Sequence, residues 1–258
     1  MHKREDIKAR LRDLLESQNH VLAAWEGGSA ATGYLDQFSD LDLIIVTDSE
    51  DTNPIFQLLQ DHFREEYGIR REYRVPEPAW HGMSQCFYLL ADCDDFFYCD
   101  IAVVACSNPN KFTEPDRHGK ALLWFDKDQQ YRAEQSPSAT REALVKRMLS
   151  GITAVDFLSI IELQKAIARD NWIAAQMNYH TLINRYLVPL LNIKYRPEKA
   201  DFGIRYADRD YPPGVVSELE ALLCITSVAD IRVKSSRALK LYDDLKTELV
   251  AQYLDTGI

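Results

Sequence analysis

The chain has 258 residues, of which 46% are hydrophobic and 27% charged, a composition typical of globular proteins that excludes a disordered or collagen-like chain. This length suits one large domain or two modest ones, and we expect two. No apolar run approaches the roughly 20 residues that cross a bilayer. The charged start, Met1 to Arg12, does not resemble a signal peptide, so we expect a cytoplasmic protein.

The net charge of −10 is concentrated in the first half of the chain. Residues 1–137 carry 14 Lys and Arg against 25 Asp and Glu, whereas residues 138–258 carry 16 against 15. Nucleic-acid binding depends on clustered basic side chains, so this distribution argues against a nucleic-acid partner and favours metal ions. The five cysteines include no Cys-x-x-Cys pair and indicate buried, reduced thiols rather than zinc ligands or disulfides.

The first half alternates between helical and strand-like patterns. Residues 106–137 contain three prolines and many polar residues, and we interpret them as an irregular connection leading out of the first domain. The expected elements before it are a helix over 3–18, strands over 20–25 and 41–46, a helix over 54–67, a strand over 69–75, and a hairpin of strands 86–91 and 96–104.

The second half is helical in pattern throughout. The expected helices run from a cap at Ser138 or Thr140 to about Arg169, from a cap at Asp170 to about Leu191, over 215–223 and over 227–253. The sequence therefore predicts an α/β (α+β) fold. A mixed β-sheet domain with helices would occupy residues 1–137, and a C-terminal helical bundle would occupy 138–258.

The first chemically informative feature is a glycine-rich turn. Gly28 and Ser29 lie where a strand turns toward a short helix, so backbone amides and a hydroxyl can face a phosphate there. A bulky side chain at this point would block that approach.

The second feature is a set of carboxylates on strands. Asp40 and Asp42 are two residues apart at the start of an apolar strand, so both side chains point the same way. Two anions so close repel unless a cation lies between them, and carboxylates with phosphate oxygens suit magnesium. Asp100, in the later strand, provides a third carboxylate. Asp94 and Asp95 are nearby alternatives, but their position in a turn argues against them.

This pattern resembles the DNA polymerase beta nucleotidyltransferase superfamily, with ten residues between Ser29 and Asp40. Within the superfamily, the small-molecule branch is the most similar, because it also joins such a domain to a C-terminal helical bundle. That branch includes aminoglycoside and lincosamide nucleotidyltransferases. The motif resemblance covers about residues 20–104.

The resemblance implies a metal-dependent, pyrophosphate-releasing nucleotidyltransferase. Two Mg²⁺ ions would be held by Asp40, Asp42 and Asp100, which are also the expected catalytic residues. The donor would be ATP or another nucleoside triphosphate. Its nucleoside monophosphate would pass to a hydroxyl of a small molecule, such as an aminoglycoside-like or lincosamide-like antibiotic. The expected nucleotide contacts come from Gly28, Ser29, Ser39 and Lys165.

The chain departs from the superfamily pattern after the Gly-Ser turn. Many relatives have an arginine there, whereas residues 30–32 read Ala-Ala-Thr. A cation for the triphosphate must then come from elsewhere, and Lys165 or Arg169 is a candidate, although a solvated helix face is the more ordinary interpretation of both. Glu162 is a candidate general base.

Three functions are compatible with these residues. The first is a small-molecule adenylyltransferase with its acceptor in an interdomain cleft. The second is a non-catalytic nucleotide-sensing or protein-interaction module on the same fold, although three intact carboxylates count against it. The third is an adenylyltransferase that modifies a protein. A basic and aromatic segment, Arg70 to Arg74, could meet a phosphate or an acceptor, but an exposed strand edge is the simpler explanation.

Overall fold

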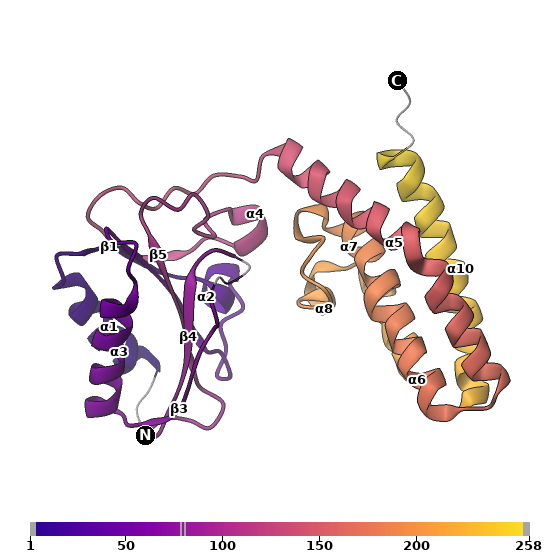
Figure 1. The fold of residues 1–258 in the computed structure, drawn as a ribbon, viewed down its shortest axis with the longest axis horizontal. Helices are drawn as coiled ribbons and strands as arrows, with labels where there is room; N and C mark the ends of the chain where they lie inside the picture. The colour runs from indigo at the N-terminus through magenta and orange to yellow at the C-terminus, as the bar shows by residue number, and fades with distance from the viewer. Residues whose placement is uncertain (1–3, 78, 80, 255–258) are drawn as a thin grey trace. The chain divides into compact units, whose positions relative to one another are not determined.

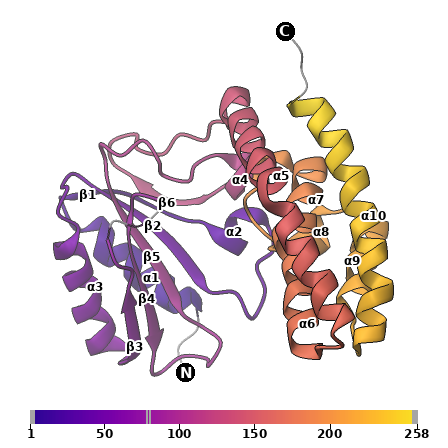
Figure 2. The same cartoon turned by 45° about the vertical axis from the view of Figure 1, so that its right-hand side comes forward.

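The computed structural model describes residues 4–77, 79 and 81–254. The chain divides into two compact units, Met1–Gln135 and Ser136–Ile258, which are described separately. The first contains a mixed six-stranded sheet with helices, and the second is helical. Figures 1 and 2 show this change of character along the chain, and the predicted fold class is confirmed.

The sheet of the first unit has the strand order β3-β4-β5-β2-β1-β6. Its β2 and β5 strands are parallel, and the other neighbouring pairs are antiparallel. The elements in chain order are α1 (Arg4–Glu16), β1 (Val21–Glu26), α2 (Gly28–Thr32), β2 (Leu41–Thr47), α3 (Asn53–Glu66), β3 (Ile69–Arg74), β4 (Ser84–Leu90), β5 (Cys99–Ala105), α4 (Pro115–His118) and β6 (Leu122–Asp126).

The predicted hairpin is present, because β4 and β5 pair antiparallel, although β5 begins at Cys99 rather than at Phe96. The interpretation of residues 106–137 as irregular was wrong. They include α4 and the edge strand β6, which pairs with β1. The partner of β6 lies far earlier in the chain, and its first two residues, Leu122 and Leu123, are exposed, so no local alternation of burial marks this strand.

The two faces of the sheet are covered differently. Helices α1 and α3 pack on one face over a large core that includes Leu11, Phe63 and Leu43. The other face has a smaller cluster, with Trp25 and Val46 near its centre, covered in part by the segment after β5. Figures 1 and 2 show α1 and α3 on one side of the sheet and α2 and α4 on the other. The second face is where the polar side chains at the starts of β2 and β5 emerge.

The second unit is built from helices around one apolar core. Its elements are α5 (Ser138–Ala168), α6 (Trp172–Thr181), the π-helix η1 (Leu182–Leu187), α7 (Val188–Tyr195), the 3₁₀ helix η2 (Pro197–Lys199), α8 (Ala207–Asp210), α9 (Pro213–Leu223) and α10 (Val228–Tyr253). The expected caps of the first two helices were wrong. No side chain caps α5, and Asn171 rather than Asp170 caps α6, accepting from the amide of Ala174 at 3.2 Å. Asp170 instead has a φ of +52°, which reverses the chain between the helices.

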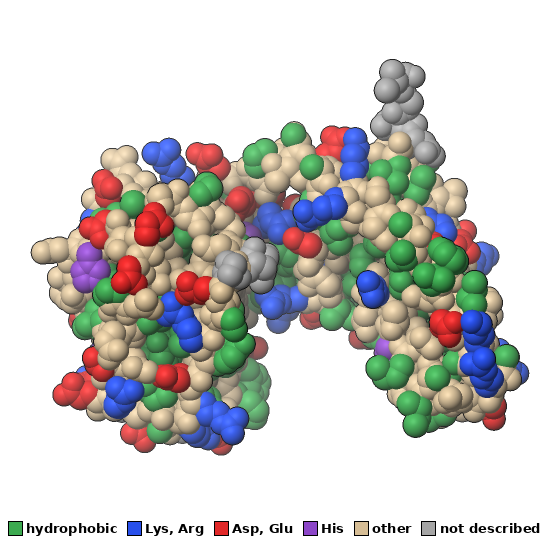
Figure 3. All heavy atoms as spheres, viewed as in Figure 1, with side chains coloured by type: hydrophobic (Ala, Val, Ile, Leu, Met, Phe, Trp, Pro, Cys, Tyr) green, Lys and Arg blue, Asp and Glu red, His purple; other side chains and the backbone are tan. Residues whose placement is uncertain are grey.

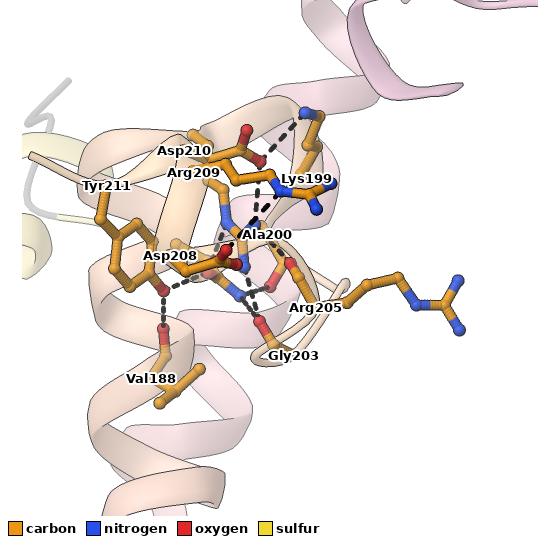
Figure 4. A network of polar contacts seen from close by, with 11 residues as sticks. Val188, Lys199, Ala200, Gly203, Arg205, Asp208, Arg209, Asp210 and Tyr211 are labelled. Atoms are coloured by element: carbon orange, nitrogen blue, oxygen red, sulfur yellow. Dashed lines mark hydrogen bonds and ion pairs between the residues drawn. The ribbon is translucent and has the colours of Figure 1, made fainter. Parts of the chain in front are cut away.

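A buried polar network joins α7 to the segment before α9 (Figure 4). Arg196 is 2% exposed, and it donates to Asp210 at 2.9 Å and to the carbonyls of Arg205 and Gly203 at 2.6 and 2.7 Å. Its Nε donates to the side-chain oxygen of Asn192, which also accepts from the hydroxyl of Tyr211. A buried guanidinium requires such partners, so this network fixes an otherwise irregular segment.

All five cysteines are free. Cys86, Cys93 and Cys99 are buried as predicted, but Cys106 is half-buried and Cys224 is exposed. Within the described ranges, none of the helices combines the length and the apolar character that a membrane span requires.

Candidate active site

Asp42 and Asp100 lie side by side at the starts of β2 and β5. The two parallel strands pair in a register that aligns Asp42 with Asp100, and register partners on neighbouring strands project from the same face. The alternate residues, including Leu43 and Ile101, enter the core beneath α1 and α3. The sequence predicted both carboxylates from strand periodicity, and the register brings together positions that are far apart in the chain.

Gln85 on β4 holds the Asp100 carboxylate. Its side-chain amide donates to Oδ1 of Asp100 at 2.6 Å. Gln85 was not predicted from the sequence, although it is a polar residue in a strand whose alternate positions, Ser84 and Cys86, are buried. Such a position on the same face as a functional carboxylate is the signal that would have identified it.

Asp40 lies just before β2 and is held at both its backbone and its side chain. Its carbonyl accepts from Nε of Arg4 at 3.2 Å, and its carboxylate accepts a hydrogen bond from the hydroxyl of Tyr98. Burial raises the pKa of Tyr98, and the hydrogen bond to Asp40 raises it further, so the hydroxyl remains protonated and able to donate. Tyr98 precedes Asp100 by two residues and was also missed, although the spacing used for Asp40 and Asp42 applies to it.

In the described part of the chain, the three predicted metal ligands do not form one metal-binding cluster. Among residues 4–77, 79 and 81–254, no group of three or more His, Cys, Asp or Glu side chains is arranged to hold a metal ion. Asp42 and Asp100 are neighbours on one face, whereas the Asp40 carboxylate is engaged by Tyr98. The donors at this end of the sheet are nonetheless hard oxygen atoms, which fit magnesium in chemical type.

The glycine turn lies against Asp42. The amide of Gly27 donates to the carbonyl of Asp42 at 2.9 Å. Gly28 has a φ of +53°, and a Cβ atom at this position would lie 1.7 Å from Oδ2 of Asp42. Ser29 follows, and its buried Oγ has no hydrogen-bond partner among the described residues. A close backbone approach to a carboxylate, beside an unsatisfied hydroxyl, fits a polar ligand that the turn and Asp42 would share.

Replacing Gly28 by alanine is expected to displace the Asp42 carboxylate while leaving the fold intact. The strained φ should cost about 1–2 kcal/mol of stability, and the new methyl group would occupy the place of Oδ2. If the turn and Asp42 bind magnesium and ATP together, as the resemblance implies, G28A should lose that binding, measured by isothermal titration calorimetry.

Gly33 provides the matched control for this prediction. Its φ is +77°, but a Cβ there would meet nothing within 4 Å. G33A should therefore have a similar backbone cost and leave any binding of magnesium and ATP unchanged. Equal binding by G28A and G33A would contradict a role for the close approach of Gly28 to Asp42.

An ion pair on the other face anchors α1 beneath the turn. Glu26, the last residue of β1, is fully buried, and its carboxylate binds Arg4 and, at 3.0 Å, Lys8. Arg4 also contacts the carbonyl of Asp40, so one side chain connects the end of β1 with the start of β2. This ion pair was not predicted from the sequence, because nothing in the local pattern pairs Glu26 with the first helix.

Ser39 has a structural partner in its own loop. Its hydroxyl donates to Asp36 at 3.0 Å and accepts from the Asp36 amide at 2.9 Å, so it closes a turn ahead of Asp40. Its predicted nucleotide contact therefore remains a prediction. On the face of the first unit drawn in Figure 3, acidic and basic side chains are interspersed.

Glu162 and Lys165 lie on α5 in the second unit, where they bind each other. Nζ of Lys165 is 2.7 Å from Oε1 of Glu162, and both side chains are about half exposed. The hydrogen bond from Lys165 lowers the pKa of Glu162, which makes it a weaker proton acceptor. Arg169 ends the same helix. The base role of Glu162 and the phosphate role of Lys165 remain predictions.

Comparison with known proteins gives a distant structural likeness. No protein-family model matches the chain, and no curated protein matches it. In structure the chain is similar to an aminoglycoside 6-adenyltransferase from Bacillus subtilis, with 10% sequence identity and a TM-score of 0.36, over 100% of this chain and 94% of that chain. A superposition at this level transfers neither a site nor an activity, so the function must be argued from the geometry of the residues.

Proposed function

We propose that the chain is a magnesium-dependent nucleotidyltransferase that moves a nucleoside monophosphate, AMP from ATP, onto a hydroxyl of a small molecule. The observation that carries the proposal is the juxtaposition on one sheet face of Asp42, Asp100 and the Gly28 turn. Two in-register carboxylates beside a turn with an unsatisfied serine hydroxyl combine ligands for a divalent cation with donors for phosphate oxygens.

Asp42 and Asp100 would hold the cation, and Asp40, whose carboxylate accepts a hydrogen bond from Tyr98, would be the third ligand. Magnesium, when bound, would lower the pKa of the acceptor hydroxyl and neutralise charge on the pyrophosphate. Gln85 keeps Asp100 in one orientation through its 2.6 Å hydrogen bond. The chain's own contribution is therefore largely positioning, as is general for phosphoryl transfer.

The Gly28 turn and Ser29 would receive the phosphate oxygens of the donor. A bond forms between the acceptor oxygen and the α-phosphorus, the bond from that phosphorus to the bridging oxygen breaks, and pyrophosphate leaves. The acceptor proton passes to a carboxylate. Glu162 is the candidate predicted from the sequence, although its pairing with Lys165 makes it a poor base until that ion pair opens.

The direct test incubates the full chain with magnesium and α-labelled ATP, and screens aminoglycosides, lincosamides and candidate proteins as acceptors. Transfer of label to a small molecule, with release of pyrophosphate, would support the proposal. Label on a protein would show a protein-modifying enzyme instead. Magnesium-dependent ATP binding without transfer to any acceptor would favour a nucleotide-sensing module, and the absence of both would overturn the assignment of this site.

A further inference from the structure

The carboxylates belong to a longer row of side chains that crosses the sheet. Tyr73 on β3 is the register partner of Phe87 on β4, and Phe87 is the register partner of Asp100 on β5. Asp100 in turn aligns with Asp42 on β2, beside the turn at Gly28. Because register partners share a face, two aromatic rings and two carboxylates follow one another across neighbouring strands, with the Gly28 turn beside Asp42.

The aromatic end of this row is exposed and ordered by ring contacts. The rings of Tyr73 and Phe87 are stacked, with centroids 6.4 Å apart and planes at 20°, and Phe87 lies 6.2 Å from the ring of Tyr98. Tyr73 is 58% exposed. These rings are not needed by the core, because the opposite side of the same strands, including Cys86 and Tyr88, already packs beneath α3.

The edge strand β3 already carries four charged residues, so protecting this edge from aggregation does not require the ring of Tyr73. The stacked pair is therefore better explained by something that binds to it. Aromatic faces bind the flat faces of other rings. Because Tyr73 and Phe87 lie at the end of the carboxylate row, a substrate bound at the carboxylates would also contact them.

The stereochemistry of the proposed reaction indicates which substrate lies over these two rings, and this step rests on the proposed function. In phosphoryl transfer the attacking and leaving oxygens lie roughly in line on opposite sides of the phosphorus. If the pyrophosphate lies at Gly28 and Ser29, the attacking oxygen lies on the far side of the carboxylates. The body of the acceptor then lies over Phe87 and Tyr73.

We propose that Tyr73 and Phe87 are the acceptor-binding surface, and that the acceptor is an alcohol built on a ring whose flat face stacks on them. Register partners have their Cα atoms about 5 Å apart, so Phe87 is about one ring width from Asp100. The reacting hydroxyl is then carried directly on the stacked ring or one carbon away from it. A saturated sugar-like ring and an aromatic ring both offer such a face.

The test measures ring binding by saturation-transfer NMR on the full chain, with benzyl alcohol and methyl β-D-glucopyranoside as ring probes and sorbitol as an acyclic probe. We expect at least one ring probe to bind the unmodified protein and sorbitol not to bind. In the double variant Y73L/F87L, which keeps apolar side chains on the strands, the affinity should fall about tenfold. The ring probe that binds more tightly shows whether the surface prefers an aromatic ring or a saturated sugar ring.

The matched control is F38L/F96L. Phe38 and Phe96 are 60% and 69% exposed and contact each other edge-on at 5.9 Å, but neither belongs to the row. This variant should bind the ring probes as the unmodified protein does. Failure of every ring probe to bind, or equal loss in both double variants, would overturn the proposal.

A second measurement separates this inference from the proposed function. D42N should lose magnesium-dependent ATP binding and keep ring binding, whereas Y73L/F87L should lose ring binding and keep ATP binding. If ATP does not bind but the rings do, the nucleotidyltransferase assignment fails while the binding surface stands. If ATP binds and the rings do not, only the surface is refuted.

Discussion

Asp42→Asn is expected to abolish nucleotidyl transfer while the protein remains folded. Asparagine preserves the shape of the side chain but removes the negative charge that a divalent cation requires. Loss of a group that merely orients a metal ligand costs about 10- to 100-fold in metal affinity or activity, so loss of the ligand itself should exceed 100-fold. The measurement is the rate of magnesium-dependent transfer of label from ATP, together with the circular dichroism spectrum and the melting temperature.

Asp61→Asn serves as the control, because Asp61 is an exposed residue of α3 whose partners are surface side chains. It removes the same charge from the same unit and should change the rate by less than about twofold, as expected for exposed surface substitutions. A D42N protein that transfers nucleotide at the rate of the unmodified protein would refute the proposed role of Asp42.

Arg196→Met is expected to destabilise the helical unit strongly. The substitution keeps the apolar length of the side chain but removes the donor to the Arg205 carbonyl. It also removes one of two donors to each of three other acceptors: Asp210 keeps Lys199, the side-chain oxygen of Asn192 keeps Tyr211, and the carbonyl of Gly203 keeps Asn192. Removing one partner of a buried ion pair costs about 3–5 kcal/mol. For a unit of this size the melting temperature should fall by about 10 °C or more. The measurement is the circular dichroism signal at 222 nm during thermal unfolding of the full chain.

Arg205→Met provides the comparison. The side chain of Arg205 is exposed and extends away from the network in Figure 4, while its backbone carbonyl, which accepts from Arg196, is unchanged by the substitution. The substitution should change the free energy of unfolding by no more than about 0.5 kcal/mol. Equal destabilisation by the two variants would mean that the network adds nothing beyond surface charge.

The Arg196 effect should also depend on pH. Burial alone would raise the pKa of Asp210, but hydrogen bonds from Arg196 and Lys199 lower it below its usual value of 3.8. A carboxyl whose pKa is lower in the folded state stabilises the fold above its unfolded pKa, and this stabilisation disappears as the pH falls through the folded value. The difference in the free energy of unfolding between R196M and the unmodified protein should therefore be largest near neutral pH and should decrease below about pH 4.

How much of this architecture the sequence predicts depends on whether the signal is local. The apolar run after Asp42, the period-two spacing of the aspartates and the turn cluster between β4 and β5 are local, and each predicted its element. Strand β6 was missed because only its long-range pairing with β1 defines it. The α6 cap was misassigned by one residue, since Asp170 and Asn171 are both favourable caps and only the backbone conformation decides between them.

The same distinction applies to the candidate site. Asp40, Asp42 and Asp100 follow from residue type and strand periodicity, whereas Gln85 and Tyr98 act on them through contacts that depend on register and loop geometry. The ion pair of Glu26 with the first helix is likewise a tertiary contact. Periodicity says that carboxylates share a face, but it does not say which neighbouring side chain holds each of them.

The alignment of β2 with β5 also means that misfolding and loss of function are coupled. A slip of one residue between these strands would set Asp42 opposite Cys99 and turn one strand's alternate side chains to the wrong side of the sheet. A carboxylate would then be driven into the apolar core under α1 and α3, which includes Leu11, Phe63 and Leu43, at the cost of its hydration. The penalty for burying these charges thus selects the single alignment in which they meet, and a misaligned molecule would be both unstable and inert.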